Sequence, residues 1–401
     1  MEPARPFDSH PFDPHSSDSR PFDLHAVDSR PFEARPFDRP RDGRAEALKT
    51  LNAMLVSLVT ERGSDLHLTA GAPPAIRVDG RMLQLKEYGR LEPADTAMLL
   101  RSAVNDAQWN RFERDQELDV AYSIEGVSRF RANFYKQRGS YGAAFRAIPH
   151  EIKALEELGL PDTVAKFAHL PRGLVLVTGP TGSGKTSTLA GLVDLANRTR
   201  SGHIVTIEDP IEFLHPHKRC IVNQREVGAD TTSFAEALKH ALRQDPDIIL
   251  VGELRDLETT TTALTAAETG HLVLATLHTQ SAAQTIDRVI DIFPPHQQQQ
   301  IRTQLSTALQ GVVTQALAPR ADGTGRVVVA EVMIATPAIR NLIREGKNHQ
   351  IPSFMQSGGS GGMIAFDQHL SDRVRSGLVS FEHALDICHS AEEFKRLVGR
   401  S

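Results

Sequence analysis

Cysteine is nearly absent from this sequence. Cys220 and Cys388 are the only two among 401 residues, and they lie far apart along the chain. Two such residues cannot build a disulfide framework or a four-cysteine zinc site within one chain. We therefore expect a protein of a reducing compartment, the cytoplasm.

Long hydrophobic runs are missing as well. The longest, such as Leu174–Val177 and Val327–Ala330, fall far short of the roughly 20 apolar residues that a membrane-spanning helix needs. The amino terminus also lacks the apolar core of a signal peptide. We expect no direct insertion into a membrane, so any membrane attachment would go through a partner.

No charge of one sign predominates. The 45 Lys and Arg residues against 50 Asp and Glu residues give a formal net charge of -5. The general positive field that would attract nucleic acid or an anionic membrane is therefore lacking. This balance disfavours nucleic acid as a partner.

The first 44 residues repeat a short phrase. Pro-Phe-Asp or Pro-Phe-Glu begins on a five-residue grid at Pro6, Pro11, Pro21, Pro31 and Pro36. Proline at this density interrupts helices and sheet ladders, and isolated phenylalanines among mixed charges cannot offset chain entropy. We expect residues 1–44 to form a disordered head, with a docking tail and a solvated leader as its alternative roles.

An α+β domain is predicted for residues 45–148. Leucines recur at helical spacing between Leu48 and Leu58. Strands are expected after them, bounded by turn residues, at Asp65–Thr69, Ala75–Val78, Leu118–Ile124 and Arg129–Tyr135. By itself this domain carries no reaction centre.

From about Pro171 short apolar strands alternate with helices, which indicates a parallel sheet with crossover helices. The strand candidates are Leu174–Thr178, His203–Ile207, Ile248–Val251 and Leu272–Thr276. From about residue 300 we expect mainly helix, interrupted by a strand at Val327–Val332. The sequence thus predicts an α/β fold in which residues 149–170 are a linker and residues 171–401 a second domain with a helical carboxyl-terminal region.

The strongest motif is a glycine-rich loop followed by a lysine. It consists of Gly179, Pro180, Thr181, Gly182, Ser183, Gly184, Lys185 and Thr186, followed by Ser187. It matches the P-loop spacing and has a predicted strand before it and a predicted helix after it. In such a loop the backbone N–H groups bind phosphate, Lys185 would meet the β- and γ-phosphates, and the Thr186 hydroxyl would ligate magnesium. We therefore predict ATP and Mg²⁺ as cofactors.

Acidic side chains follow the predicted strands, at the edge where an open parallel sheet binds its ligands. Glu253 follows the third strand candidate, where a Walker B carboxylate would lie, and is our first choice for the group that positions or deprotonates the attacking water. Glu212 is the alternative base, while Glu208 and Asp209 are expected to bind nucleotide or the magnesium-bound waters. A lone carboxylate would suggest a helix cap or a surface acid, but this clustering favours a site.

His278 follows the fourth strand candidate. That position suits a sensor that hydrogen-bonds to the γ-phosphate. A histidine satisfied within the core explains the position equally well, so both interpretations stay open.

Four segments together resemble the secretion and pilus ATPase superfamily, namely Gly179–Thr186, Thr206–Glu212, Gly252–Asp256 and Thr269–Thr279. Three further segments are similar to the PilT-type retraction ATPases of type IV pili, namely Val222–Gly228, Asp245–Asp256 and Ala338–Glu345. The likeness runs from about residue 45 to the end. Thr186 in place of the common serine, and Leu254 in place of methionine, are mild departures.

The resemblance implies a homo-hexamer whose subunits each pair a PAS-like amino-terminal domain with a RecA-like ATPase domain, with ATP between the two. Arginines of the smaller domain would then reach the γ-phosphate, and the matching ones are Arg129, Arg131 and Arg146. A surface ion pair is the alternative role for each of them. The resemblance also implies a cytoplasmic protein, peripheral at the inner membrane through a platform protein at the pilus base.

The segment after the last predicted strand is expected to be a helix, because Thr336 and Pro337 suit its start and Gly346 its end. Arg340 and Arg344 would share one face of it. In the family this helix is needed for retraction in addition to hydrolysis, so the resemblance implies a role in coupling or partner contact. The residues alone indicate a solvated basic face.

The predicted function is therefore that of an ATP-hydrolysing motor for pilus retraction and twitching motility. An assembly or secretion ATPase of the same superfamily is one alternative, although such proteins typically carry a four-cysteine zinc insertion that two distant cysteines cannot build. A regulatory paralogue that uses nucleotide only to switch shape is another, and the acidic residues at the strand ends argue against it. A DNA translocase is disfavoured by the charge balance.

Overall fold

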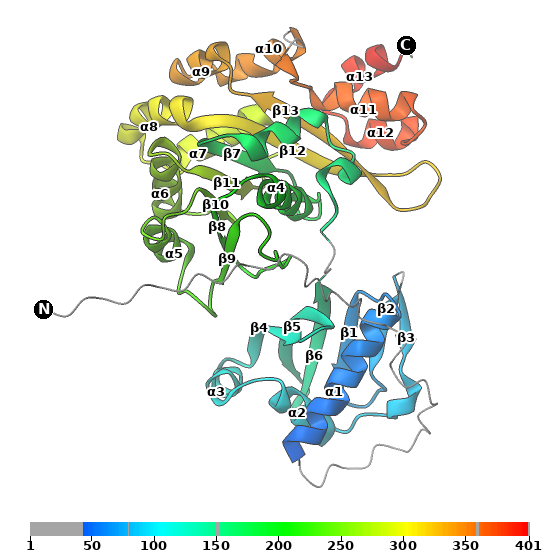
Figure 1. The fold of residues 1–401 in the computed structure, drawn as a ribbon. Coiled ribbons are helices and arrows are strands. Elements are labelled where there is room, and N and C mark those ends of the chain that lie inside the picture. The colour runs from blue at the N-terminus through cyan, green and yellow to red at the C-terminus, as the bar shows by residue number, and fades with distance from the viewer. Residues whose placement is uncertain (1–42, 79, 149–151, 358–360, 400–401) are drawn as a thin grey trace, which may run out of the picture.

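The computed structural model describes residues 43–78, 80–148, 152–357 and 361–399, and these residues form two sheets with separate cores (Figure 1). We call residues 43–148 the amino-terminal unit and residues 152–399 the carboxyl-terminal unit. Most of the predicted head lies outside the described residues. Its last two residues, Gly43 and Arg44, instead begin the first helix, where the Arg44 guanidinium donates to the carbonyl of Val104 at 2.7 Å.

The amino-terminal unit is built on a six-stranded antiparallel sheet with the order β3-β2-β1-β6-β5-β4. Its elements are α1 (Gly43–Thr60), β1 (Asp65–Thr69), β2 (Ala75–Val78), β3 (Arg81–Gln84), the 3-10 helix η1 (Lys86–Tyr88), α2 (Pro93–Ser102), α3 (Asp106–Asp115), β4 (Glu117–Ile124), β5 (Ser128–Gln137) and β6 (Ser140–Ile148). The predicted helix and four predicted strands are present. Strands β3 and β6 were not predicted.

The core of this unit lies where helix α1 packs on the sheet. Leucines of α1 that recur at helical spacing, Leu51, Leu55 and Leu58, are fully buried. They meet buried aromatic side chains such as Phe130 of β5 and Phe145 of β6. Apolar burial of this kind stabilises the unit independently of the other sheet.

The carboxyl-terminal unit is built on a seven-stranded sheet with the order β13-β12-β7-β11-β10-β8-β9, in which only β12 and β13 pair antiparallel. Its strands are β7 (Gly173–Thr178), β8 (His203–Glu208), β9 (Ile221–Glu226), β10 (Ile248–Val251), β11 (Leu272–Leu277), β12 (Leu309–Pro319) and β13 (Arg326–Ile334). Its helices are η2 (Leu155–Leu158), η3 (Asp162–His169), α4 (Lys185–Thr199), α5 (Phe234–Ala241), α6 (Leu257–Glu268), α7 (Ala282–Asp291), α8 (Pro295–Ala308), α9 (Pro337–Arg344), η4 (Asn348–Gln350), α10 (Ile351–Ser357), α11 (Phe366–Arg375), α12 (Phe381–Ile387) and α13 (Ala391–Val398). The predicted α/β fold is confirmed.

Both faces of this sheet are covered, as the continuous apolar strands require. Leu174 and Leu176 of β7 face the layer that contains α5 to α8, whereas Val175 and Val177 face the layer that contains α4 (Figure 1). The strand that leads into the glycine-rich loop is therefore held on both sides. Its carboxyl end, like those of β8, β10 and β11, opens at one edge of the sheet.

Two parts of this unit differ from the predictions. Residues 309–319, expected to be helical, form the long strand β12, whose first half, Leu309–Thr314, pairs with Leu174–Thr178 of β7. The expected linker contains η2 and η3, and Leu155, Val164 and Phe167 in it are buried in the core on the α4 side. This stretch packs on the carboxyl-terminal unit because its apolar residues find partners there.

Helices α11, α12 and α13 form a small cluster against the outer strands of the sheet. Phe366, Leu370 and Phe394 are buried there together with Ala318 of β12 and Val329 of β13. None of the helices that the structure describes is long and apolar enough to cross a membrane. The helical carboxyl-terminal region is confirmed.

Candidate nucleotide site

The glycine-rich loop connects the end of β7 to the start of α4 (Figure 1). Gly179, Gly182 and Gly184 have φ angles of 136°, 78° and 89°, in the left-handed region that favours glycine. A Cβ atom at Gly179 would lie 2.2 Å from the carbonyl oxygen of Gln315. The loop can therefore take this shape only with glycine at that position, and it precedes a helix amino terminus as a phosphate-binding loop does.

Within the loop, Pro180 and Thr181 are exposed, whereas Ser183 is buried. Among the described residues the Ser183 hydroxyl has no hydrogen-bond partner. A buried polar atom without a partner is costly unless a ligand satisfies it. Thr186 and Ser187 are half-buried in the first turn of α4.

Lys185 lies over the loop that precedes it. Its ammonium donates to the carbonyl oxygens of Gly179 at 2.8 Å and Pro180 at 3.1 Å, and lies 3.5 Å from Nδ1 of His278. Burial lowers the pKa of Lys185, while the negative charges of Glu253 and Glu212 act in the opposite direction. The loop lysine and the predicted acids therefore share one electrostatic site.

Glu253 follows β10 by two residues, and each of its carboxylate oxygens contacts a different side chain. Arg255 donates to Oε2 at 2.8 Å, and Nε2 of His278 lies 3.3 Å from Oε1. Burial raises the pKa of Glu253, but the hydrogen bonds and charges of Arg255 and His278 outweigh it and hold the pKa below its usual value. The carboxylate is thus ionised and fixed in place at neutral pH.

His278 joins the lysine and the carboxylate. With a proton on Nε2 the ring donates to Glu253, and its Nδ1 lies within reach of the Lys185 ammonium. The structure thus places Lys185, Glu253 and His278 together, as the strand ends led us to expect. Its contacts are polar and its side chain is 47% exposed, so His278 is not a core histidine.

The loops that carry Glu253 and His278 are each fixed at their far end by a helix cap. Asp256 accepts from the backbone N–H of Thr259 at the start of α6, and Ser281 accepts from that of Gln284 at the start of α7. Short, capped connections of this kind limit how far the two side chains move.

Glu208 differs from the other acids because it is buried at the end of β8. Its carboxylate accepts from the Thr206 hydroxyl at 2.6 Å, from the Gln224 amide at 3.2 Å and from the backbone N–H of Glu212 at 3.4 Å. Burial raises the pKa of Glu208. Asp209 and Glu212 are exposed, so they are the acids of this turn that can meet a ligand directly.

The three candidate arginines have different surroundings. Arg129 forms an ion pair with Glu226 of β9, across the two units, and only 18% of its side chain is exposed. Arg131 and Arg146 lie directly opposite each other on β5 and β6, with 50% and 71% of their side chains exposed. Of the three, Arg131 and Arg146 are the accessible ones.

Sequence reasoning missed Gln315, whose side chain touches the glycine-rich loop. It lies on β12, which pairs with β7 and was expected to be helical. A polar residue in the apolar run Val312–Leu317 is the signal that would have found it, because a buried amide in a strand needs partners.

The expected solvated basic face of α9 is present only in part, because Arg344 is exposed whereas Arg340 is half-buried. Arg340 turns inward, and its guanidinium donates to the carbonyl oxygens of Ser306 and Thr307, both at 2.6 Å. These carbonyls belong to the last turn of α8, which has no basic residue of its own there. Arg340 therefore satisfies the end of α8, where cations are favoured.

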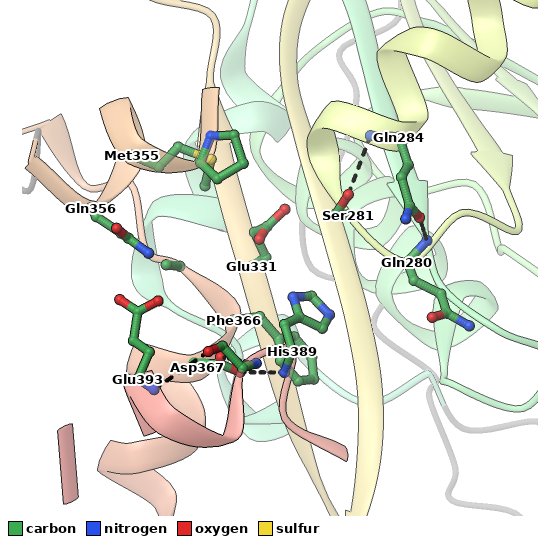
Figure 2. Close-up of a pocket in the computed structure, with 13 residues that line it drawn as sticks. Gln280, Ser281, Gln284, Glu331, Met355, Gln356, Phe366, Asp367, His389 and Glu393 are labelled. Carbon is green, nitrogen blue, oxygen red and sulfur yellow. Dashed lines mark hydrogen bonds between the residues drawn. The ribbon is translucent and has the colours of Figure 1, made fainter. Parts of the chain in front are cut away.

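A separate hollow of about 410 Å³ lies between the start of α7, strand β13 and helices α10, α11 and α13 (Figure 2). Its carboxylates already have partners: Glu331 accepts from the backbone of Ala282, Asp367 accepts from the backbone of His389 and Ser390, and Glu393 forms an ion pair with Arg396. None of the predicted site residues lines it. In the part of the chain that the structure describes, no group of three or more His, Cys, Asp or Glu residues is arranged to hold a metal ion by itself.

Comparison with known proteins gives consistent matches. The family model described as type II/IV secretion system protein matches residues 41–385. The type IV pilus retraction ATPase PilT of Pseudomonas aeruginosa is 51% identical over 344 residues, which cover 86% of this chain and 99% of that protein. The twitching motility protein of Neisseria gonorrhoeae is 46% identical over 329 residues, covering 80% of this chain and 88% of the relative.

The fold also matches a solved structure. The crystal structure of the pilus retraction motor PilT with bound ADP superposes with a TM-score of 0.81 at 49% sequence identity. The match covers 86% of this chain and 98% of that one.

Proposed function

The chain belongs to the type II/IV secretion system protein family and is an ATPase, and we propose that its ATP hydrolysis drives the retraction of type IV pili. The observation that carries the proposal is the contact set that joins Lys185, His278 and Glu253 beside the glycine-rich loop. Relatives that span almost the same residues are named for pilus retraction and twitching motility.

ATP binds with its phosphates on the backbone N–H groups of the loop. Lys185 then exchanges the carbonyl oxygens of Gly179 and Pro180 for the β- and γ-phosphate oxygens. The glycine cradle and the buried Ser183 hydroxyl that lacks a partner among the described residues fit a phosphate group.

Hydrolysis uses the residues at the strand ends. Glu253 positions or deprotonates the attacking water, and Arg255 and His278 hold its carboxylate in place for this. Magnesium, when bound, neutralises charge on the phosphates. The half-buried Thr186 hydroxyl and the exposed Asp209 carboxylate are the hard oxygen ligands that fit it or its waters, because Glu208 is already engaged by three protein donors.

The motor acts as a homo-hexamer, with a PAS-like amino-terminal domain and a RecA-like ATPase domain in each subunit and ATP between them. The accessible Arg131 and Arg146 supply positive charge to the γ-phosphate. The ring works on a platform protein at the pilus base and is held by it at the cytoplasmic side of the inner membrane. Closure of the small domain over ATP and its release after hydrolysis give the displacement.

Deletion of the gene in its native host tests this function. Surface pili are measured by shearing, and surface motility is measured in the same strains. Retraction predicts abundant pili with lost motility. The wild-type gene should restore motility in the deletion strain. A gene that carries Glu253→Gln is the matched control, because it supplies the protein but not its proposed ATP hydrolysis.

Two other outcomes contradict the proposal. Loss of surface pili would identify an assembly ATPase. Unchanged pili and motility would identify an accessory or regulatory ATPase, which acts only beside a second motor.

A further inference from the structure

Both polar groups of the Gln315 side-chain amide form hydrogen bonds with the segment made of the glycine-rich loop and the start of α4. Its Nε2 donates to the carbonyl oxygen of Ser183 at 2.8 Å, and its Oε1 accepts from the hydroxyl of Thr188 at 2.8 Å. Ser183 lies in the glycine-rich loop and Thr188 in the first turns of α4. The amide thus bridges the loop and the helix that follows it.

This bridge is buried and closely fitted. Gln315 is 2% exposed, and Thr188 is also 2% exposed. A Cβ atom at Gly184 would lie 3.1 Å from the Gln315 amide nitrogen, and one at Gly179 would lie 2.2 Å from its backbone oxygen. Strand β12 therefore touches the loop at both ends, through one residue.

The direction of the amide is fixed by its partners. The carbonyl oxygen of Ser183 only accepts, so the NH₂ group of Gln315 must face it. The Thr188 hydroxyl then donates to the amide oxygen. A carboxylate at position 315 would place an acceptor oxygen against the carbonyl oxygen of Ser183, which also only accepts. A protonated carboxyl group would again offer Ser183 a donor.

The same strand is linked through β7 and α7 to the loop that carries His278. Thr314, next to Gln315, shares a hydrogen bond of 2.8 Å with Thr178 at the end of β7. Thr285 of α7 lies 3.5 Å from Thr178 and 2.7 Å from Thr279, which follows His278. A chain of threonine hydroxyl groups therefore connects β12, the start of the glycine-rich loop and the loop that carries His278.

We infer that Gln315 is a positioning residue for ATP: it holds the glycine-rich loop and the start of α4 in the shape that presents their N–H groups to phosphate. It touches neither the reacting atoms nor the water that attacks them. The inference rests on the proposed use of this loop for ATP. A side chain of the right volume at position 315 is therefore not sufficient, because the hydrogen-bond donor that faces the carbonyl of Ser183 is also needed.

The test compares Gln315→Leu, Gln315→Asn and Gln315→Glu with the control Gln300→Glu, which changes an exposed glutamine of α8. Affinity for a fluorescent ADP analogue and the KM and kcat of ATP hydrolysis are measured at pH 6 and pH 8. Burial raises the pKa of a carboxyl group placed at position 315, so the glutamate is more fully protonated at the lower pH than at the higher. Thermal unfolding and oligomeric state are recorded for every variant.

We expect Gln315→Leu to weaken ADP binding and raise KM roughly tenfold at both pH values, because two buried hydrogen-bonding groups lose their partner. Gln315→Glu should be at least as defective at pH 8 and recover most of its affinity at pH 6. Wild type and Gln300→Glu should share one pH dependence. Gln315→Asn, which is too short to bridge both groups, should resemble the leucine variant.

Unchanged ADP affinity in folded Gln315→Leu and Gln315→Asn would overturn the inference, as would a Gln315→Glu defect with the same pH dependence as wild type. If Gln315→Leu does not fold, the ADP affinity of Gln315→Glu at pH 6 and pH 8 decides, because this comparison uses a single variant. A wild-type protein that binds ADP but hydrolyses no ATP would count against the motor and leave the binding comparison valid.

Discussion

Glu253 and His278 face each other across the ends of two neighbouring strands, with Oε1 of the carboxylate 3.3 Å from Nε2 of the ring. On its other side the ring reaches Lys185, at 3.5 Å. One imidazole ring therefore links Lys185 to Glu253, the carboxylate that we propose as the catalytic base.

Replacement of Glu253 by glutamine should separate binding from turnover. The amide keeps the size of the side chain but cannot accept a proton, so we expect nucleotide affinity close to wild type and a loss in kcat of roughly 100-fold or more. ATP hydrolysis and ADP-analogue binding are the measurements. Lys185→Ala is the control, which should lose both.

Vigorous hydrolysis by Glu253→Gln would move the base to Glu212. That acid is exposed and its charge also acts on Lys185. Glu212→Gln is then the variant that should lose turnover.

The Arg255 ion pair predicts how turnover depends on pH. Arg255 and His278 together hold the pKa of Glu253 below its usual value, against the effect of burial. Because the proposed base acts in its ionised form, we expect kcat/KM to fall only on the acid side of the usual glutamate range. Arg255→Ala removes the larger of the two lowering influences, so the acid limb of the pH profile should move to higher pH. A profile that stays in place would contradict this assignment.

Arg340 should matter for stability. Its guanidinium donates to two backbone carbonyls at the end of α8 and to the carbonyl of Ala335 at 2.8 Å. Arg340→Ala leaves these acceptors without a donor, and we expect a loss of about 2 kcal/mol in the free energy of unfolding. Chemical denaturation measures this loss.

Arg344→Ala is the matched control on the same helix. Its side chain is exposed, so the free energy of unfolding should change by less than about 0.5 kcal/mol. If Arg340→Ala is as stable as wild type yet abolishes motility, Arg340 acts on a partner and not on α8.

The accessible arginines should affect turnover without affecting ADP. Arg131→Ala and Arg146→Ala are expected to lower kcat at least about tenfold, since an arginine that meets the γ-phosphate stabilises transition-state charge. ADP has no γ-phosphate, so its affinity should not change. Arg129→Ala is the comparison, because the Arg129 side chain is much less exposed than the other two and pairs with Glu226 across the two units. Loss of kcat in the Arg129 variant alone would mean that this ion pair opens during turnover.

Much of the strand pattern was predictable because apolar runs and turn residues mark it locally. The bounds of β1, β2 and β10 agree with the prediction to the residue. Glu253 and His278 could be singled out because they follow the predicted strands that became β10 and β11, and parallel strands end at one edge of a sheet.

Strand β12 could not be recognised in the same way, because no glycine or proline separates it from α8 and the helix passes directly into the strand at Leu309. The inward turn of Arg340 was also hidden, since it depends on carbonyls of another helix far away in sequence. Contacts of this kind appear only when the chain is folded.

The strand order has a consequence for how this site is made. Strand β7, which leads into the glycine-rich loop, lies between β11 and β12, so Gly173 pairs with Leu272 and Leu174 pairs with Leu309. During synthesis the loop emerges long before the strands that hold it, and such distant pairings form slowly. We therefore expect a ribosome-bound chain that ends before β12 to contain the whole glycine-rich motif but to lack the contacts that Gln315 makes with it.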